Sequence, residues 1–513
     1  MNLYRFFLSI IVALCFNLTV SSKQIHPLTQ AMLDGYEQIL KENPNDYFTL
    51  YQRAQQYYKL SMYVEAQKDI TRAIELTPKS EKEMLSSQYS LLANIHIEQA
   101  DYDKALSAIN SAIENSANTY PLLNTKGNIC LHLNDWENAK KAFRQMQQIN
   151  SRSQEAFFGL ARIAIAQGDI SMANTLMTEA EKCDPSNYIT YCRLGDLYAE
   201  MKDYEHAATN YLSAFGLSSG KDRPMDSLIR LSRNNYDAVK NAIDYALSKA
   251  NNTLPLYFLE ANISFLNDRF YDAHDAYRIL LDYPEGQDAN VYARMAETCL
   301  AIDKTDDALK YANRAVALNY NCQNLILKSK IERALGNLDN ALIASNDAIH
   351  LSDRNDTNAL VESALTNISI NKTDEAMLLL NEAIMVNGEE FYPLMIRAFV
   401  YDSILGDLRN SVADYQRASE LSADQFPDLF YKAFALAMSG KKSDGDTIIE
   451  SELSENPNNP KTHYYAAIYY AQLSVLDKAV ECRNKAISLS FENEYLLKTD
   501  KTANLNLSPI FNL

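Results

Sequence analysis

Small side chains recur in this chain at a fixed spacing of 34 residues. Three columns carry the register: Ala93, Gly127, Ala161 and Gly195; Ala105, Ala139, Ala173 and Ala207; and Ala112, Met146, Ala180 and Ala214. A period of about 34 residues with small side chains in fixed columns is typical of an array of helical hairpins. A single hairpin cannot bury its own apolar face, so the hairpins must stack on their neighbours.

The composition favours helices and argues against several classes of partner. Only 13 Gly and 13 Pro occur among 513 residues, which leaves few turn signals for a strand-rich fold. The formal net charge is −18, from 48 Lys and Arg against 66 Asp and Glu. A nucleic-acid-binding protein needs a basic surface, so we expect no nucleic-acid partner and no adhesion to anionic lipid.

No motif for catalysis or metal binding stands out. The seven histidines are scattered, and no nucleophile elbow, phosphate-binding loop or helical zinc motif is visible. Nearly every long segment already fits a repeat, which leaves no room for a separate enzyme domain. We therefore expect a non-enzymatic protein with no cofactor and no bound metal.

The columns resemble the tetratricopeptide repeat family. That family has a small residue at position 8, an aromatic residue at 11, Ala at 20 and 27 and often Pro at 32. Residues 47–80 fit the pattern at these positions and at position 24: Ala54, Tyr57, Ala66, Ile70, Ala73 and Pro78. The resemblance extends from residue 47 to residue 493. It implies an all-α, right-handed superhelical α-solenoid of about thirteen repeats.

The register also predicts how the chain is divided. The segments are an N-terminal array at 23–219 with a capping helix at 27–44, a degenerate repeat at 220–253, a C-terminal array at 254–493, and a C-terminal cap at 494–513. Terminal repeats need such covers because one apolar flank is otherwise open to water. Pro224 falls inside an expected first helix, so we predict a shortened helix and a bend there.

Residues 1–22 have the layout of a secretory signal peptide. Arg5 precedes an apolar run from Phe6 to Val20, and small residues follow at Ser21 and Ser22. The run is shorter than the roughly 20 apolar residues of a membrane span, so we expect cleavage and no membrane anchor. The predicted location is the bacterial periplasm or the cell surface.

The cysteines raise two further questions. Cys15 could be the lipidated cysteine of a lipoprotein signal. That signal has a small residue directly before the cysteine, whereas Leu14 is bulky, which argues against a lipid anchor. Cys183 and Cys192 flank one turn between repeats and are the only pair placed to form a disulfide. The sequence leaves that disulfide open.

The resemblance implies which side chains line the concave face, because positions 2, 5, 9, 12 and 13 of the first helix point into it in this family. The candidate partner-binding residues are Phe48, Tyr51, Gln55, Tyr58, Asn94, Asn124, Asn128, Phe158, Arg162, Asp196, Phe258, Asn262 and Phe265. An Asn amide can donate and accept hydrogen bonds at once, which suits a peptide backbone. Exposed Phe and Tyr rings would contact the partner's apolar side chains.

We therefore expect a scaffold that binds a peptide or a partner protein in this groove, within an envelope or secretion-related assembly. Two alternatives stay open. One is a module that binds a glycan or another small ligand, which would need aromatic residues clustered in one place. The other is a structural spacer, which a featureless concave face would favour.

Overall fold

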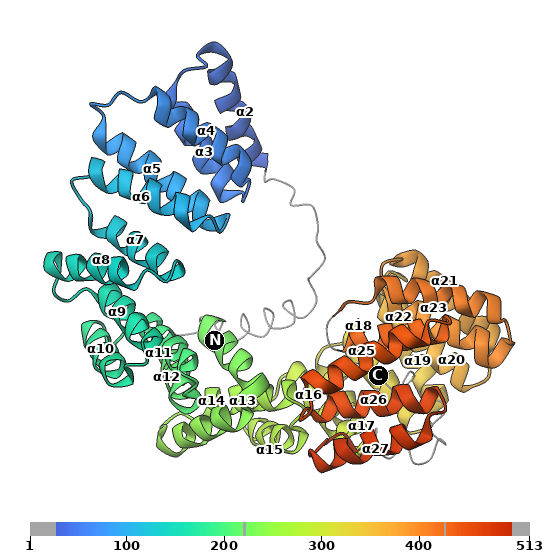
Figure 1. Ribbon diagram of the computed structural model, residues 1–513. Helices are drawn as coiled ribbons and strands as arrows, with labels where there is room; N and C mark the ends of the chain where they lie inside the picture. The colour runs from blue at the N-terminus through green and yellow to red at the C-terminus, as the bar shows by residue number, and fades with distance from the viewer. Residues whose placement is uncertain (1–26, 219–221, 425–426, 495–513) are drawn as a thin grey trace. The chain divides into compact units, whose positions relative to one another are not determined.

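The protein is built from α-helices throughout the part of the chain that the structure describes. The computed structural model describes residues 27–218, 222–424 and 427–494, and these contain 26 α-helices and no strand (Figure 1). The predicted all-α solenoid is therefore confirmed. The predicted signal peptide, with Cys15, and all but the first residue of the predicted C-terminal cap lie outside the described residues.

The chain divides into two compact units, residues 1–242 and 243–513, called unit 1 and unit 2 below. The helices of unit 1 are α2 (Pro27–Glu42), α3 (Tyr47–Lys59), α4 (Tyr63–Leu76), α5 (Lys82–Glu98), α6 (Tyr102–Asn115), α7 (Tyr120–His132), α8 (Trp136–Ile149), α9 (Gln154–Ala166), α10 (Ile170–Cys183), α11 (Tyr188–Glu200) and α12 (Tyr204–Leu217). The boundary between the units lies within α13 (Asp222–Lys249).

Unit 2 continues the same pattern. Its helices are α14 (Leu254–Leu266), α15 (Phe270–Leu281), α16 (Ala289–Ala301), α17 (Thr305–Leu318), α18 (Cys322–Ala334), α19 (Leu338–Leu351), α20 (Thr357–Ser369), α21 (Thr373–Val386), α22 (Phe391–Phe399), α23 (Leu408–Leu421), α24 (Asp428–Met438), α25 (Lys442–Glu455), α26 (Pro460–Gln472) and α27 (Leu476–Ser488). A short 3₁₀ turn, η1 (Pro284–Gly286), follows α15, and a π-helical turn, η2 (Val400–Leu405), extends α22.

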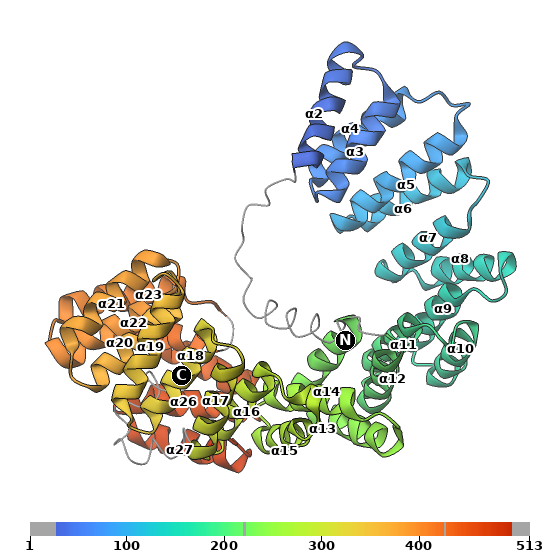
Figure 2. The same cartoon turned by 180° about the vertical axis from the view of Figure 1, so that it is seen from behind.

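The helices pack as successive pairs, seen from two sides in Figures 1 and 2. Five pairs precede α13, α13 forms a pair by itself, and seven pairs follow, so the described residues contain thirteen pairs. This matches the number of repeats predicted from the register. First helices of neighbouring pairs also contact one another, as α3 does with α5, and α9 with α7 and α11. The first helices therefore form the inner side of the array.

The small-residue columns lie where helices meet. Ala105, Ala139, Ala173 and Ala207 on the second helices have no exposed surface. A Cβ atom added to Gly127 would lie 2.5 Å from the ring of Phe143, which the second helix of the same pair contributes. Interiors are packed without room for an extra methyl group at such points, so the columns stay small.

Aspartates begin many of the second helices. The Asp169 side chain accepts a hydrogen bond from the backbone N–H of Met172, directly after Gly168, whose φ is 76°. Asp101, Asp135, Asp203 and Asp407 cap their helices in the same way. Such caps satisfy N–H groups that the first helical turn leaves without partners.

The α2 helix lies where the N-terminal capping helix was expected, and it packs on α3. Its inward residues are Leu33 and Leu40, both buried, with Tyr36 half-buried between them. Met32 and Ile39 on the same helix are 40% and 46% exposed. The helix therefore presents a narrow apolar stripe to the array.

The shortened helix expected at Pro224 is not present. The first part of α13 starts at Asp222, which places Pro224 in the first helical turn, and helical geometry breaks at Asn235 (φ −140°, ψ 50°). Proline is tolerated in a first turn because the N–H it lacks would have no helical partner there. This pair is therefore of ordinary length.

Candidate functional site

The inner face of unit 1 begins with aromatic and amide side chains on α3. Phe48 is 50% exposed, and Tyr51, Gln55 and Tyr58 are half-buried. The Asp46 side chain caps α3, and Arg53 on the same helix donates to Asp69 on α4 at 2.6 and 2.9 Å. These contacts fix the helix that carries the four candidate residues, so their rings and amide are presented from a rigid element.

Asparagines continue this surface on α5 and α7. Asn94 and Asn124 are half-buried, and Asn128 is exposed. The Asn128 amide lies 3.5 Å from the side-chain oxygen of Asn124, which is the limit of a hydrogen bond. Each amide has two donors and two acceptor lone pairs, so most of this capacity stays unused within the unit.

The surface changes character at α9 and α11. Phe158, predicted as an exposed contact residue, is only 4% exposed, and the Arg193 guanidinium lies 4.2 Å from its ring centroid. The expectation of an exposed ring was wrong, because an arginine of the next pair covers the face of this one. Cation–π stacking of this kind is favourable when water is excluded.

Arg162 and Asp196 are engaged in charge pairs of unit 1. Arg162 donates to Glu200 at 2.8 Å. Asp196 accepts a hydrogen bond from the Tyr211 hydroxyl at 2.8 Å and lies 3.2 Å from Arg223. This end of the inner face is therefore charged and internally paired, whereas α3, α5 and α7 present mainly uncharged groups.

The three candidate residues of unit 2 contribute to its internal packing. The Asn262 amide donates to the backbone oxygen of Phe258 at 2.8 Å and accepts from the Tyr277 hydroxyl at 3.3 Å. The Phe265 ring lies 6.0 Å from Phe270 and 4.7 Å from the Arg294 guanidinium. Phe258 and Phe265 both pack against the apolar core of their pair. These three side chains are half-buried, and each also contributes to packing within its pair.

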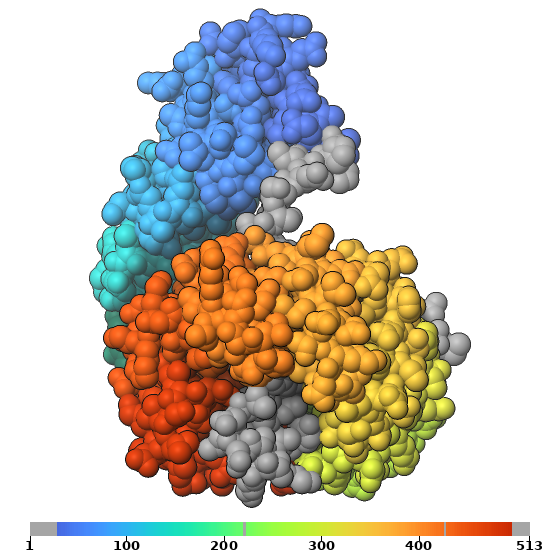
Figure 3. Space-filling view, turned by 90° about the vertical axis from the view of Figure 1, so that its right-hand side faces the viewer, coloured from blue at the N-terminus to red at the C-terminus, as the bar shows by residue number. Residues whose placement is uncertain are grey.

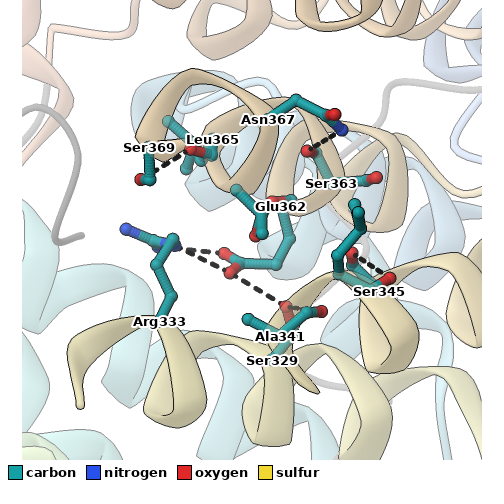
Figure 4. A network of polar contacts seen from close by, with 11 residues as sticks. Ser329, Arg333, Ala341, Ser345, Glu362, Ser363, Leu365, Asn367 and Ser369 are labelled. Carbon is teal, nitrogen blue, oxygen red and sulfur yellow. Dashed lines mark hydrogen bonds and ion pairs between the residues drawn. The ribbon is translucent and has the colours of Figure 1, made fainter. Parts of the chain in front are cut away.

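A buried ion pair, which the sequence pattern did not reveal, joins α18 and α20 (Figure 4). Arg333 donates to the two carboxylate oxygens of Glu362 at 3.0 and 3.1 Å, and their side chains are 8% and 7% exposed. Ser329 Oγ lies 3.3 Å from the same carboxylate and 2.8 Å from the Ala341 carbonyl oxygen. A bidentate pair of this kind fixes orientation as well as distance.

Three half-buried tyrosines, Tyr392, Tyr431 and Tyr465, form what we call the tyrosine cluster. The ring centroid of Tyr431 lies 6.2 Å from that of Tyr392 and 6.4 Å from that of Tyr465. Burial raises the pKa of each phenol. The sequence does carry a signal for this cluster, because three successive first helices contain aromatic doublets: Phe391–Tyr392, Phe430–Tyr431 and Tyr464–Tyr465.

The cysteines of the described residues are all free thiols, including Cys183 and Cys192. Cys192 is buried, and the Cys183 thiol donates to the backbone oxygen of Glu179 at 3.2 Å. Cys130 and Cys299 have no exposed surface, and burial raises the pKa of both thiols. They therefore fill the core as small apolar side chains.

Within the described ranges, no helix has the length and hydrophobicity that a membrane crossing requires.

Comparison with known proteins identifies the repeat. The family model of the tetratricopeptide repeat matches residues 188–220, the segment of α11 and α12. The same helix pair with the same small-residue columns recurs along the described chain. Residues 188–220 therefore match the tetratricopeptide repeat, and the other helix pairs resemble that one. Proteins of this repeat class are in general scaffolds for protein–protein interaction.

One curated relative is anaphase-promoting complex subunit 3 of Schizosaccharomyces pombe (strain 972), 25% identical over 183 residues. The match covers 36% of this chain and about a quarter (27%) of that relative's length. Among solved structures, yeast Tom70 aligns over 89% of this chain and 95% of its own, with 16% identity and a TM-score of 0.39. The Cut9–Hcn1 hetero-tetramer of APC/C aligns over 90% and 96%, with 14% identity and a TM-score of 0.30.

Proposed function

We propose that this protein is a non-enzymatic scaffold that binds an extended segment of a partner protein on the inner face of unit 1. The observation that carries the proposal is the run of uncharged, partly exposed residues on three successive first helices: Phe48, Tyr51 and Gln55 on α3, Asn94 on α5, and Asn124 and Asn128 on α7. Partly exposed aromatic rings supply apolar contact area. The amides between them suit hydrogen bonding to a peptide backbone.

The charged end of the same face favours α3, α5 and α7 as the contact region. Arg162, Asp196 and their partners already satisfy one another, so a bound peptide would have to break those pairs to use them. We do not assign the contact region to unit 2, because Asn262 and Phe265 already contribute to packing there.

A site-specific photo-crosslinker tests this proposal directly. Placed at Asn94 on α5, a benzophenone amino acid should crosslink the partner in a native extract. The matched control is Asn110, a half-buried Asn on α6, the second helix of the same pair. Equal crosslinking from Asn110, or none from Asn94, would contradict the proposal. A crosslinked product that contains sugar and no peptide would favour the glycan-binding alternative.

We also propose that the protein acts outside the cytoplasm of a bacterium, in an envelope or secretion-related assembly. The support is the apolar run at Phe6–Val20, followed by Ser21 and Ser22, and the acidic composition. N-terminal sequencing of the protein purified from its native source tests this. A mature chain that starts near residue 23 in the envelope fraction is expected, and an uncleaved cytoplasmic chain would contradict it.

A further inference from the structure

Arg193 on α11 carries a positive charge that lacks a hydrogen-bonded counter-ion. The residue is half-buried, and its guanidinium lies 4.2 Å from the ring centroid of Phe158 on α9. Among the residues that the structure describes, Arg193 makes no hydrogen bond and no ion pair. Arg53 and Arg397, which are also half-buried, each donate to an aspartate of their own helix pair. The N–H groups of Arg193 therefore lack the carboxylate that these other arginines have.

The pKa values of these side chains reflect the same difference. Burial lowers the pKa of the Arg193 guanidinium. Asp69 instead raises the pKa of Arg53, to which it is hydrogen-bonded. Removing a charge from water without a compensating partner is unfavourable. An anion that binds Arg193 would offset this unfavourable burial.

The carboxylates one helical turn from this stack have other partners. Glu155 lies one turn before Phe158 on α9, and it accepts a hydrogen bond from the Tyr120 hydroxyl at 3.4 Å. Asp196 lies one turn after Arg193 on α11, and a tyrosine and an arginine already bind it, as described above. Both carboxylates are engaged elsewhere, which leaves the guanidinium to an anion from outside the protein.

The stacked guanidinium is suited to a carboxylate in particular. An arginine that lies flat on an aromatic ring keeps its N–H groups at the edge of the stack, where a carboxylate can accept two parallel hydrogen bonds. A doubly charged phosphate would be repelled by Glu155 and Asp196 on either side. The site therefore favours the single negative charge of a carboxylate.

Arg193 lies further along the inner face that presents Asn124 and Asn128. Helix α7 contacts α9, and α9 contacts α11. Figure 3 shows the surface of unit 1 running on from the blue helices into the teal ones. Packed helices lie about 8–10 Å apart, and an extended chain advances about 3.3 Å per residue. An extended segment that contacts Asn128 would therefore reach Arg193 about six residues further on.

We propose that Arg193 binds one acidic side chain of the partner segment, which accepts two hydrogen bonds from the guanidinium beside the Phe158 ring. This inference rests on the proposed function of unit 1 and adds the chemical class of the partner to it. The net charge of −18 would repel a segment that is acidic throughout. The expected partner is therefore an extended segment with one Asp or Glu, about six residues from the position that contacts Asn128.

Selection from a random peptide library displayed on phage, with the full chain as bait, tests this site without a known partner. Selected peptides should share an Asp or Glu at one fixed position. Replacement of that glutamate by glutamine should weaken binding to the wild-type protein about tenfold in Kd. Arg193→Met keeps an unbranched side chain beside the Phe158 ring and should bind both peptides equally. Arg193→Lys keeps the charge without the fork and should retain part of the difference.

Arg144→Met is the matched control, because it removes an exposed arginine from α8, a second helix, and should keep the full tenfold difference. Circular dichroism should show wild-type helix content in all three variants. A preference for glutamate that persists in Arg193→Met would overturn the inference, as would tighter binding of a phosphoserine version of the peptide. Selected peptides that bind Phe48→Ala as tightly as wild type, or a library that yields no peptide, would contradict the proposed function as well.

Discussion

A Cβ atom placed on Gly195 would lie 2.5 Å from the ring of Tyr211. Tyr211 lies on the second helix of the same pair, and its ring packs against Gly195. The Tyr211 ring is 3% exposed, and its hydroxyl donates to Asp196 at 2.8 Å. The ring is therefore held at its apolar side by packing and at its polar end by a hydrogen bond. The glycine in the register is there because this tyrosine fills the space of its side chain.

Gly195→Ala should therefore destabilise unit 1 by about 1–3 kcal/mol, the usual cost of overpacking a filled core. The measurement is the free energy of unfolding from urea titration, followed by circular dichroism. Gly216→Ala is the matched control, because a Cβ added at Gly216 would meet nothing within 4 Å. Alanine is the better helix former, so this control should stabilise by about 0.5–1 kcal/mol. Equal effects of the two substitutions would contradict the packing argument.

Removal of one partner of the buried ion pair should be costly. Arg333→Met leaves the Glu362 carboxylate buried without its guanidinium, for which we expect a loss of about 3–5 kcal/mol in unit 2. The double variant Arg333→Met with Glu362→Met should recover most of that loss. The control is Arg162→Met in unit 1, whose pair with Glu200 is exposed and should cost at most about 1 kcal/mol. Urea titration of the wild-type protein and the three variants makes the comparison.

The stability of unit 1 should fall between pH 7.5 and pH 5.5 because of His96. This side chain is 5% exposed, Nδ1 has no hydrogen-bond partner, and burial lowers its pKa from the ordinary value of 6.5. The unfolded chain therefore binds the proton more readily than the folded one. The stability that this group contributes is present above about pH 6.5 and is lost as the pH falls below it.

The test of this pH dependence is a comparison of urea midpoints at the two pH values. His96→Gln should reduce the difference between them, since it removes the buried titrating group. The control His206→Gln shows whether the loss of a histidine at an exposed position has the same effect. A His96→Gln protein with an unchanged pH dependence would show that another group is responsible.

Phe265→Ala should weaken unit 2 and leave partner capture by unit 1 intact. The ring packs against Phe270 and beneath Arg294, and we expect a loss of about 2 kcal/mol on the basis of the apolar area it buries. Phe48→Ala on α3 should weaken partner capture and leave the stability of unit 1 nearly unchanged, because half of that residue faces solvent. Capture of the crosslinked partner and thermal melting, measured on both variants, separate the two effects.

The thirteen helix pairs, their small-residue columns and most helix-capping aspartates follow from the sequence alone. These features depend on contacts within one pair or with the next, and such contacts repeat at a spacing that the sequence displays. Ala173 and Asp169 illustrate this, since each acts within its own pair. Tertiary structure decided which inner residues remain accessible: Arg193 of the next pair covers Phe158, and Glu492 reaches Arg269 across a whole unit. Those contacts depend on how far each helix pair is rotated relative to the one before it. A periodic sequence pattern specifies the spacing of the pairs but not this rotation.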